Sequence, residues 1–178
     1  MKILLTLTAG IALLGAAGLM GSAKSQAAQN DVYAFGVTSQ NPGCTEDGQP
    51  FCLSSAFTYR VLAVQHGDGH AWGVVSRFRH ESGTTRTGSV TCMTVADGKA
   101  AIGGIETTPS SDPFLLVVQD RGVPGDSVSD RISPYAVFPP GDPGLSELPP
   151  DFPRTCPSPD SAFGYFPQAS GDITVTGE

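Results

Sequence analysis

The chain has 178 residues, of which 39% are hydrophobic and 15% are charged, and its formal net charge is −7 at pH 7. This length suits one domain, and the hydrophobic content supports a core but excludes an integral membrane protein. An acidic chain without a basic patch repels nucleic acid and anionic lipid, so neither is expected as a partner. The 22 Gly and 15 Pro residues favour short strands joined by many turns.

Residues 1–27 have the pattern of a secretory signal peptide. Lys2 precedes an apolar run over residues 3–20, and Ser25-Gln26-Ala27 places small residues where a signal peptidase cuts. We therefore expect cleavage after Ala27 and a secreted, extracellular protein; the alternative is an uncleaved membrane anchor. Cleavage would remove two lysines and no acid, which would lower the formal charge from −7 to −9.

The rest of the chain, residues 28–178, is predicted to form a single β domain. Alternating or continuous apolar runs separated by turn signals are typical of antiparallel strands joined by hairpins. A last strand that pairs with the first would leave few free edges, so we expect a closed or partly closed barrel of about eight strands, with a β-sandwich as the alternative. The expected strands cover residues 32–38, 56–65, 71–79, 84–95, 99–106, 114–119, 131–138 and 171–176.

The central meander carries the clearest local signals. Trp72, Val74, Ser76 and Phe78 share one face of a strand, and the opposite face ends in Arg77 and Arg79. Asp97-Gly98 fits a type I′ hairpin turn. Gly103-Gly104 marks a bulge, a bend or a close backbone approach. The run over residues 114–119 is apolar throughout and is expected to be buried on both faces.

Residues 139–167 are rich in proline. Proline removes a backbone donor and fixes φ, so this stretch cannot form an ordinary helix or a central strand. We expect a long, partly ordered loop that is tied back to the domain by Cys156 and by the aromatic residues Phe163, Tyr165 and Phe166.

Four cysteines follow the predicted signal peptide, at positions 44, 52, 92 and 156. An even number in an exported chain favours two disulfides, and four cysteines allow three pairings. Cys44 and Cys52 flank a short loop and are natural local partners, which would leave Cys92 to join Cys156. The rival interpretation is a zinc site, which the spacing of Cys44 and Cys52 disfavours.

The motifs GSVTCMTVADGKAAIGGIET, FLLVVQDRG and GDSVSDRIS are followed by a Pro-rich stretch with one Cys and by SGDITV. In this order they resemble a group of small exported proteins of actinobacteria and related bacteria. The resemblance covers most of the chain after the signal peptide. It implies an all-β fold and a pairing of Cys92 with Cys156, and it leaves the activity open.

Two groups of residues are candidate metal ligands. His66 and His70 flank a tight turn, and with Asp68 and His80 they could hold zinc or copper. Asp120, Asp126 and Asp130 form an acidic loop that could hold calcium, although their spacing matches no EF-hand. The alternative for both groups is a solvated turn. No cofactor motif is present, so no cofactor is expected.

The interior of a barrel is the remaining candidate site. Trp72, Phe78, Phe57, Phe35 and Tyr59 could line a ligand pocket there, or could simply form the core. No G-x-S-x-G motif is present, so a hydrolase is disfavoured and no catalytic residue is assigned. We therefore expect a non-enzymatic extracellular or cell-envelope binding protein. A small-molecule carrier is the second hypothesis and an enzyme the third, and the partner stays open between a small ligand and an envelope protein.

Overall fold

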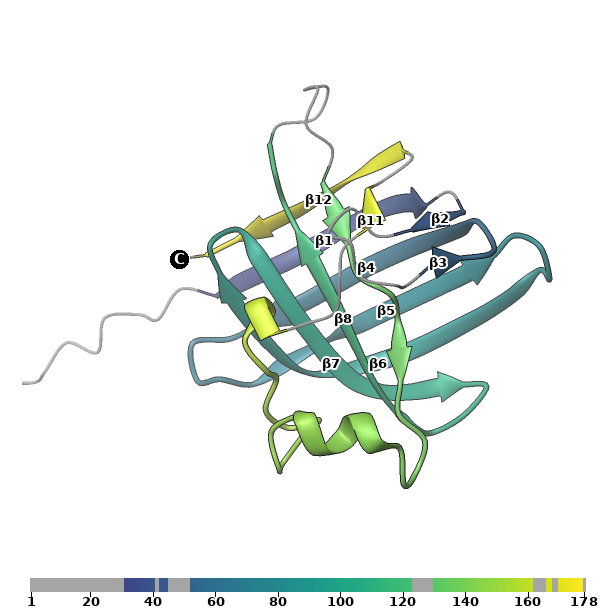
Figure 1. Ribbon diagram of the computed structural model, residues 1–178. Helices are drawn as coiled ribbons and strands as arrows, with labels where there is room; N and C mark the ends of the chain where they lie inside the picture. Colours follow the sequence, from purple (N-terminus) through teal and green to yellow (C-terminus); the bar gives the residue numbers. More distant parts are fainter. Residues whose placement is uncertain are drawn as a thin grey trace, which may run out of the picture.

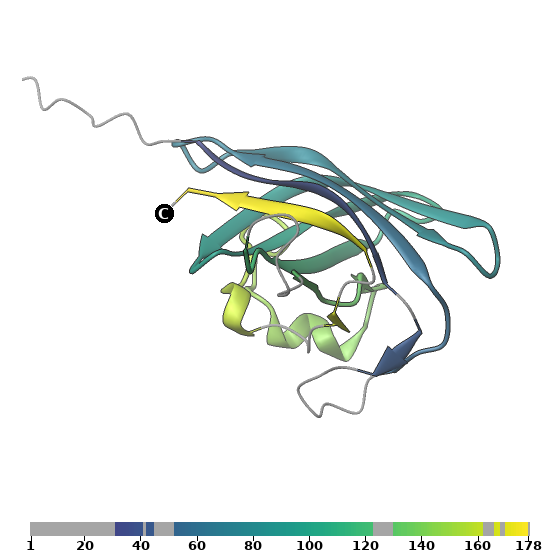
Figure 2. The ribbon, with the colours of Figure 1, turned by 90° about the horizontal axis from the view of Figure 1, so that it is seen from above.

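The computed structural model describes residues 31–40, 42–44, 52–122, 130–161, 166–167 and 170–177. A single antiparallel sheet follows the path β11-β9-β8-β7-β6-β5-β4-β1-β12, with β10 paired to β8, and it curls into a half-barrel (Figures 1 and 2). The strands of this sheet are β1 (Val32–Gln40), β4 (Phe57–Gln65), β5 (Ala71–Arg79), β6 (Thr84–Ala96), β7 (Lys99–Thr108), β8 (Pro113–Gln119), β9 (Arg131–Ile132), β10 (Ala136–Val137), β11 (Phe166–Pro167) and β12 (Ser170–Thr176). A separate ribbon joins β2 (Gly43–Cys44) to β3 (Cys52–Leu53).

The predicted antiparallel meander and the partly closed barrel are confirmed. The last strand pairs with the first, from Tyr33 opposite Thr176 to Ser39 opposite Ser170. Asp97 and Gly98 have φ values of 50° and 68°, as the predicted type I′ turn requires. The predicted signal peptide and its cleavage site lie outside the described residues.

The inner face of the sheet holds the main core. On β4 the alternation places Phe57, Tyr59, Val61 and Ala63 inside, where each is at most 7% exposed. They pack against inward residues of β7, β8 and β12, among them Ile102, Phe114, Leu116 and Ile173. The face of β4 that carries these four residues is therefore the core face of the half-barrel.

A second, smaller core lies on the other face of β7 and β8. Ala101, Leu115, Val117 and Phe138 are buried there, with Leu145, Leu148 and Phe152 packed against them. β8 is thus buried on both faces, as its continuous apolar run predicted.

The second core is covered by residues 139–161, which we call the Pro-rich arm. It contains two 3₁₀ helices, η1 (Pro143–Glu147) and η2 (Pro159–Ser161), and runs beneath the half-barrel (Figures 1 and 2). A disulfide between Cys92 and Cys156 ties it to β6, and the Thr91 hydroxyl donates to the Pro153 carbonyl. The expected tie through Cys156 is confirmed, whereas Phe163 and Tyr165, and the side chain of Phe166, lie outside the described part.

The glycine pair of β7 permits this arrangement. The pairing of β6 with β7 shifts register between Val90 and Cys92, opposite Gly104 and Gly103. A Cβ atom on Gly103 would lie 2.8 Å from the Cys92 sulfur and 2.7 Å from the Phe152 ring, so only glycine leaves room for the disulfide and the arm. The predicted bulge and close approach are both present.

Two aspartates join β12 to the other end of the sheet. Asp120, after β8, accepts a hydrogen bond from the Val175 amide at 3.2 Å, and Asp130, before β9, accepts one from the Ile173 amide at 2.9 Å. The second oxygen of Asp130 accepts from the Arg121 amide. These carboxylates satisfy backbone donors along the free edge of β12, in place of a neighbouring strand.

Candidate functional site

The outer face of β1, β4 and β5 carries the large exposed hydrophobic residues of the described chain. Their exposed fractions range from 39% for Tyr33 to 53% for Val37. Strand register brings them together, because Phe35 lies opposite Leu62, which lies opposite Val74. We call this surface the outer patch; its members are Tyr33, Phe35, Val37, Leu62, Trp72 and Val74.

The location of the outer patch corrects the prediction for three aromatic residues. Trp72 is 51% exposed and Phe35 is 46% exposed, and Phe78 lies on the same outer face of β5. Phe57 and Tyr59 are inside, as expected. The face of β5 that enters the barrel is the one with the arginines, so the core side of this strand is the opposite of the one that its apolar residues suggested.

The outer patch is hollowed along its centre. A groove of about 450 Å³ runs between β1 and β5 across β4, and Arg60 is the cation in its lining. A second hollow of about 380 Å³ continues from Val37 toward Thr58 and His80. The outer patch therefore combines apolar side chains, aromatic rings and one positive charge around a shallow, open hollow on the outer face of the sheet.

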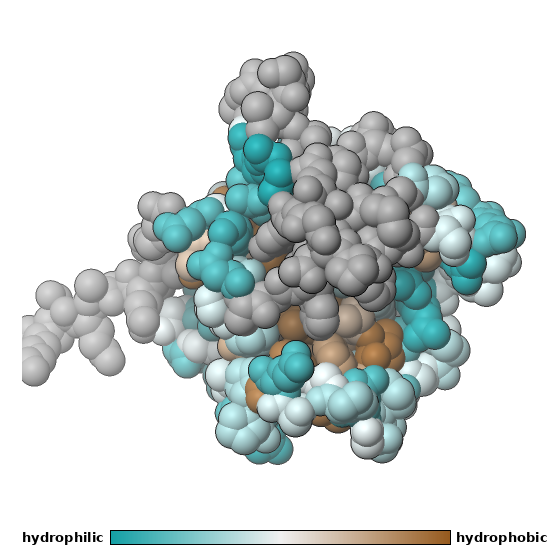
Figure 3. Space-filling view, viewed as in Figure 1, coloured by the Kyte–Doolittle hydropathy of each residue, from teal (hydrophilic) through white to brown (hydrophobic). Residues whose placement is uncertain are grey.

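The Pro-rich arm, by contrast, carries none of the large exposed hydrophobics of the described residues. Figure 3 shows the side of the molecule that carries the arm, where hydrophilic residues cover most of the lower surface and a smaller apolar area lies above them. The apolar surface expected of an interaction protein thus lies on the sheet and not on the arm.

One end of the outer patch is held by a chain of hydrogen bonds through His66. The Trp72 indole N–H donates to His66 Nε2 at 2.9 Å, and His66 Nδ1 lies 3.0 Å from an Asp31 carboxylate oxygen. The two rings also stack, with centroids 6.4 Å apart. His66 therefore accepts at Nε2 and donates at Nδ1, which is the neutral tautomer with its proton on Nδ1.

Removal of the His66 ring is expected to change the fluorescence of Trp72. His66→Phe removes the acceptor of the indole N–H. Trp72 is the single tryptophan, so the emission reports on its surroundings alone. We expect the emission maximum of His66→Phe to differ from that of the wild type.

The matched control for this comparison is His70→Phe. It should keep the wild-type emission, because no described contact joins the His70 ring to Trp72. An unchanged emission in His66→Phe would show that the contact with His66 does not control the fluorescence.

Inside the half-barrel, one cross-strand row of inward residues is polar. Tyr59 lies opposite Arg77, and Arg77 lies opposite Arg86. Thr38 extends the row onto β1. We call these four residues the polar row. Arg77 contacts two aromatic rings, with its guanidinium carbon 4.9 Å from the Phe57 centroid and 5.2 Å from the Tyr135 centroid.

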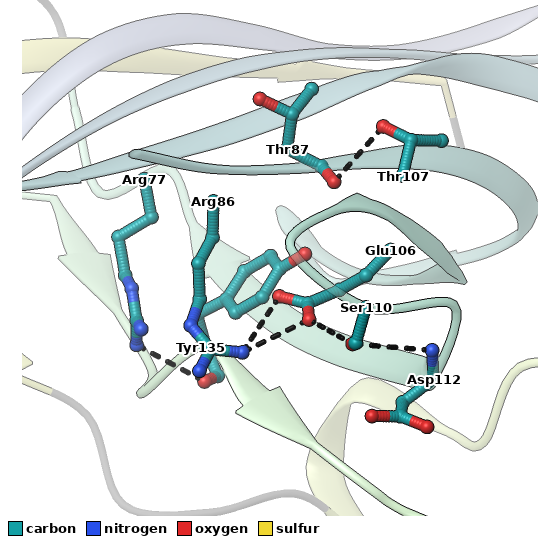
Figure 4. Close-up of polar contacts among 8 residues, drawn as sticks. All are labelled: Arg77, Arg86, Thr87, Glu106, Thr107, Ser110, Asp112 and Tyr135. Carbon is teal, nitrogen blue, oxygen red and sulfur yellow. Dashed lines mark hydrogen bonds and ion pairs between the residues drawn. The ribbon is translucent and has the colours of Figure 1, made fainter. Parts of the chain in front are cut away.

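Glu106 of β7 balances one of the two arginines. Its carboxylate is fully buried and accepts two hydrogen bonds from Arg86, at 2.9 and 3.1 Å, and one from Ser110 at 2.6 Å (Figure 4). Arg77 instead donates to the Tyr135 carbonyl at 3.4 Å. Burial raises the pKa of Tyr59 to about 12, with the nearby Arg77 opposing the shift, so Tyr59 is protonated at neutral pH.

The structure does not assemble the predicted metal ligands. Within the described ranges, no three His, Cys, Asp or Glu side chains lie close enough to hold a metal ion. His80 contacts Thr58 near the second hollow, away from the turn with His66 and His70. Asp120 and Asp130 bind the β12 amides described above, and Asp126 lies outside the described residues. Desolvation, followed by the nearby Asp130 and Asp120, raises the pKa of Asp172.

Cys44 and Cys52 lie directly opposite each other in the β2–β3 ribbon. This backbone register fits the predicted local pairing, although their side chains are not among those described. The polar row was not predicted from the sequence, where its one signal is the position of Arg77 and Arg79 on the same face as Val75.

No helical segment in the described part of the chain has the length and hydrophobicity of a membrane span. Comparison of the chain with family models, with curated proteins and with solved structures finds no match.

Proposed function

We propose that this protein is a non-enzymatic binding protein of the extracellular space or cell envelope, and that it docks a partner protein through the outer patch. The observation that supports this is six large hydrophobic side chains, half-exposed and contiguous on one sheet face. Contiguous apolar surface of this kind is typical of interaction sites. The Cys92–Cys156 disulfide fits an oxidising compartment, and export itself rests on the sequence.

The composition of the outer patch favours a particular kind of partner. Aromatic residues and arginine are enriched in protein interfaces, and the patch and its groove supply Trp72, Tyr33, Phe35 and Arg60. Because the chain is acidic, two copies repel each other at low ionic strength. We therefore propose a different protein as the partner, one with an apolar surface and an acidic group opposite Arg60.

Site-specific photo-crosslinking tests this proposal. A photoreactive amino acid at Leu62 should link one defined protein in cells that produce this chain, whereas the same group at Ser146, which is exposed on the Pro-rich arm, should not. The linked protein is then purified and its affinity measured. We expect Leu62→Glu and Arg60→Glu each to weaken binding by about tenfold or more, and Ser146→Glu to leave it unchanged.

Two outcomes would contradict the proposal. Equal crosslinking from Leu62 and Ser146 would show that the outer patch is not a specific contact. A crosslink between two copies of this chain would identify the patch as a self-association surface instead.

A further inference from the structure

Among the described residues, the two arginines of the polar row are direct neighbours of a single carboxylate, that of Glu106. Arg77 and Arg86 are direct cross-strand neighbours, and Glu106 is bound by Arg86. In the described part of the chain, Arg77 forms no ion pair with a carboxylate. A guanidinium stays charged at any physiological pH, and a charge that is partly removed from water needs a partner.

Hydrogen-bond donors at the same place are also unmatched. Tyr59 Oη and Arg77 Nε are both buried and have no hydrogen-bond partner among the described residues. Both groups carry a proton at neutral pH, so both can donate. Two donors without an acceptor, beside an unbalanced positive charge, call for an acceptor that is itself negative.

The surrounding aromatic rings hold the guanidinium in place without supplying that acceptor. Phe57 and Tyr135 both contact it, and their π-systems offset part of its charge. The N–H groups of a guanidinium lie in its plane, and the one at Nε is left without an acceptor among the described residues. Arg77 is only partly buried, which gives a small ion access from solvent.

We propose that Arg77 and Tyr59 form a binding site for a small monovalent anion, either chloride or a short carboxylate such as formate. Arg77 Nε and the Tyr59 hydroxyl would donate to the anion, and Phe57 and Tyr135 would keep the guanidinium plane fixed. This site is separate from the outer patch and does not depend on the proposed partner.

Thermal unfolding in different sodium salts at constant ionic strength tests the site. Gluconate, which is too bulky for the site, serves as the reference anion. Replacing it by chloride or formate should raise the Tm of the wild type by about 5 °C when the anion is present at about one hundred times its dissociation constant. Whichever of the two anions saturates at the lower concentration identifies the preferred ligand. Arg77→Met should abolish the dependence on the anion.

Arg79→Met is the matched control. Arg79 is two residues along the same strand and pairs with Glu81, so this variant should keep the full anion dependence. Tyr59→Phe provides a second variant that we expect to fold, because the hydroxyl it removes has no described partner. It should weaken anion binding by about tenfold, through the loss of one donor.

Chloride NMR gives an independent measurement. Binding should broaden the ³⁵Cl resonance in the presence of the wild type, and formate or Tyr59→Phe should reverse the broadening. A wild-type Tm that does not respond to the anion, or an equal response in Arg77→Met, would overturn the site and leave water as the partner of these donors.

Discussion

Replacing Glu106 by Gln is expected to destabilise the protein by about 3–5 kcal/mol, because it leaves the Arg86 guanidinium inside the half-barrel without its counter-charge. Glu106 has a fully buried carboxylate and receives three hydrogen bonds from Arg86 and Ser110. The amide keeps the shape of the side chain but turns one acceptor oxygen into a donor. The free energy of unfolding from urea titration measures the loss.

The pair Arg79–Glu81 supplies the matched control. It joins the same residue types at a similar distance, 2.8 Å against 2.9 Å, and the two arginines are similarly exposed (40% and 36%), but the Glu81 side chain is 66% exposed whereas that of Glu106 is fully buried. Glu81→Gln should therefore change the stability little. The double variant Arg86→Met/Glu106→Leu should recover most of the loss, since neither charge is then left unpaired. If Glu106→Gln were no more harmful than Glu81→Gln, the buried pair would not contribute to stability.

The sequence predicted the strands and their turns because these depend on neighbouring residues. The Asp97-Gly98 turn, the bulge beside Gly103 and Gly104 and the doubly buried β8 each follow from a local pattern. The strand order then followed from the turns, because strands joined by short hairpins pair with their neighbours in the sequence.

The direction in which β5 faces could not be predicted in this way. Alternation shows which residues share a face of a strand, but both faces of β5 carry apolar residues, and the choice between them depends on distant partners. Arg77 points inward because the rings of Phe57 and Tyr135 contact its guanidinium there and the Tyr135 carbonyl accepts a hydrogen bond from it, and these two residues belong to distant parts of the chain. The same choice places Trp72 and Val74 outside and creates the outer patch.

The acidic loop illustrates the same limit. Asp120 and Asp130 were candidate calcium ligands because they are carboxylates close together in sequence. In the structure they bind backbone amides of β12, which lies 55 and 43 residues further along. Only the closure of the sheet brings these groups together.

Removing the Cys92–Cys156 disulfide is expected to destabilise the protein by about 4 kcal/mol, because the bond closes a loop with a sequence separation of 64 residues. The loss should have a second, local effect. The disulfide ties the Pro-rich arm over Ala101, Leu115 and Val117, so its removal should raise amide hydrogen exchange in β7 and β8 before it does so in β4.

The double variant Cys92→Ala/Cys156→Ala tests both effects by urea unfolding and hydrogen exchange. Cys44→Ala/Cys52→Ala is the control, because it removes the same number of cysteines from a much shorter segment; its effect on stability should be smaller, and β7 and β8 should stay protected. Equal losses from the two variants would show that the bond does not act through the length of its loop. Unchanged exchange in β7 and β8 would show that hydrophobic packing alone, through Phe138 and Phe152, holds the arm in place.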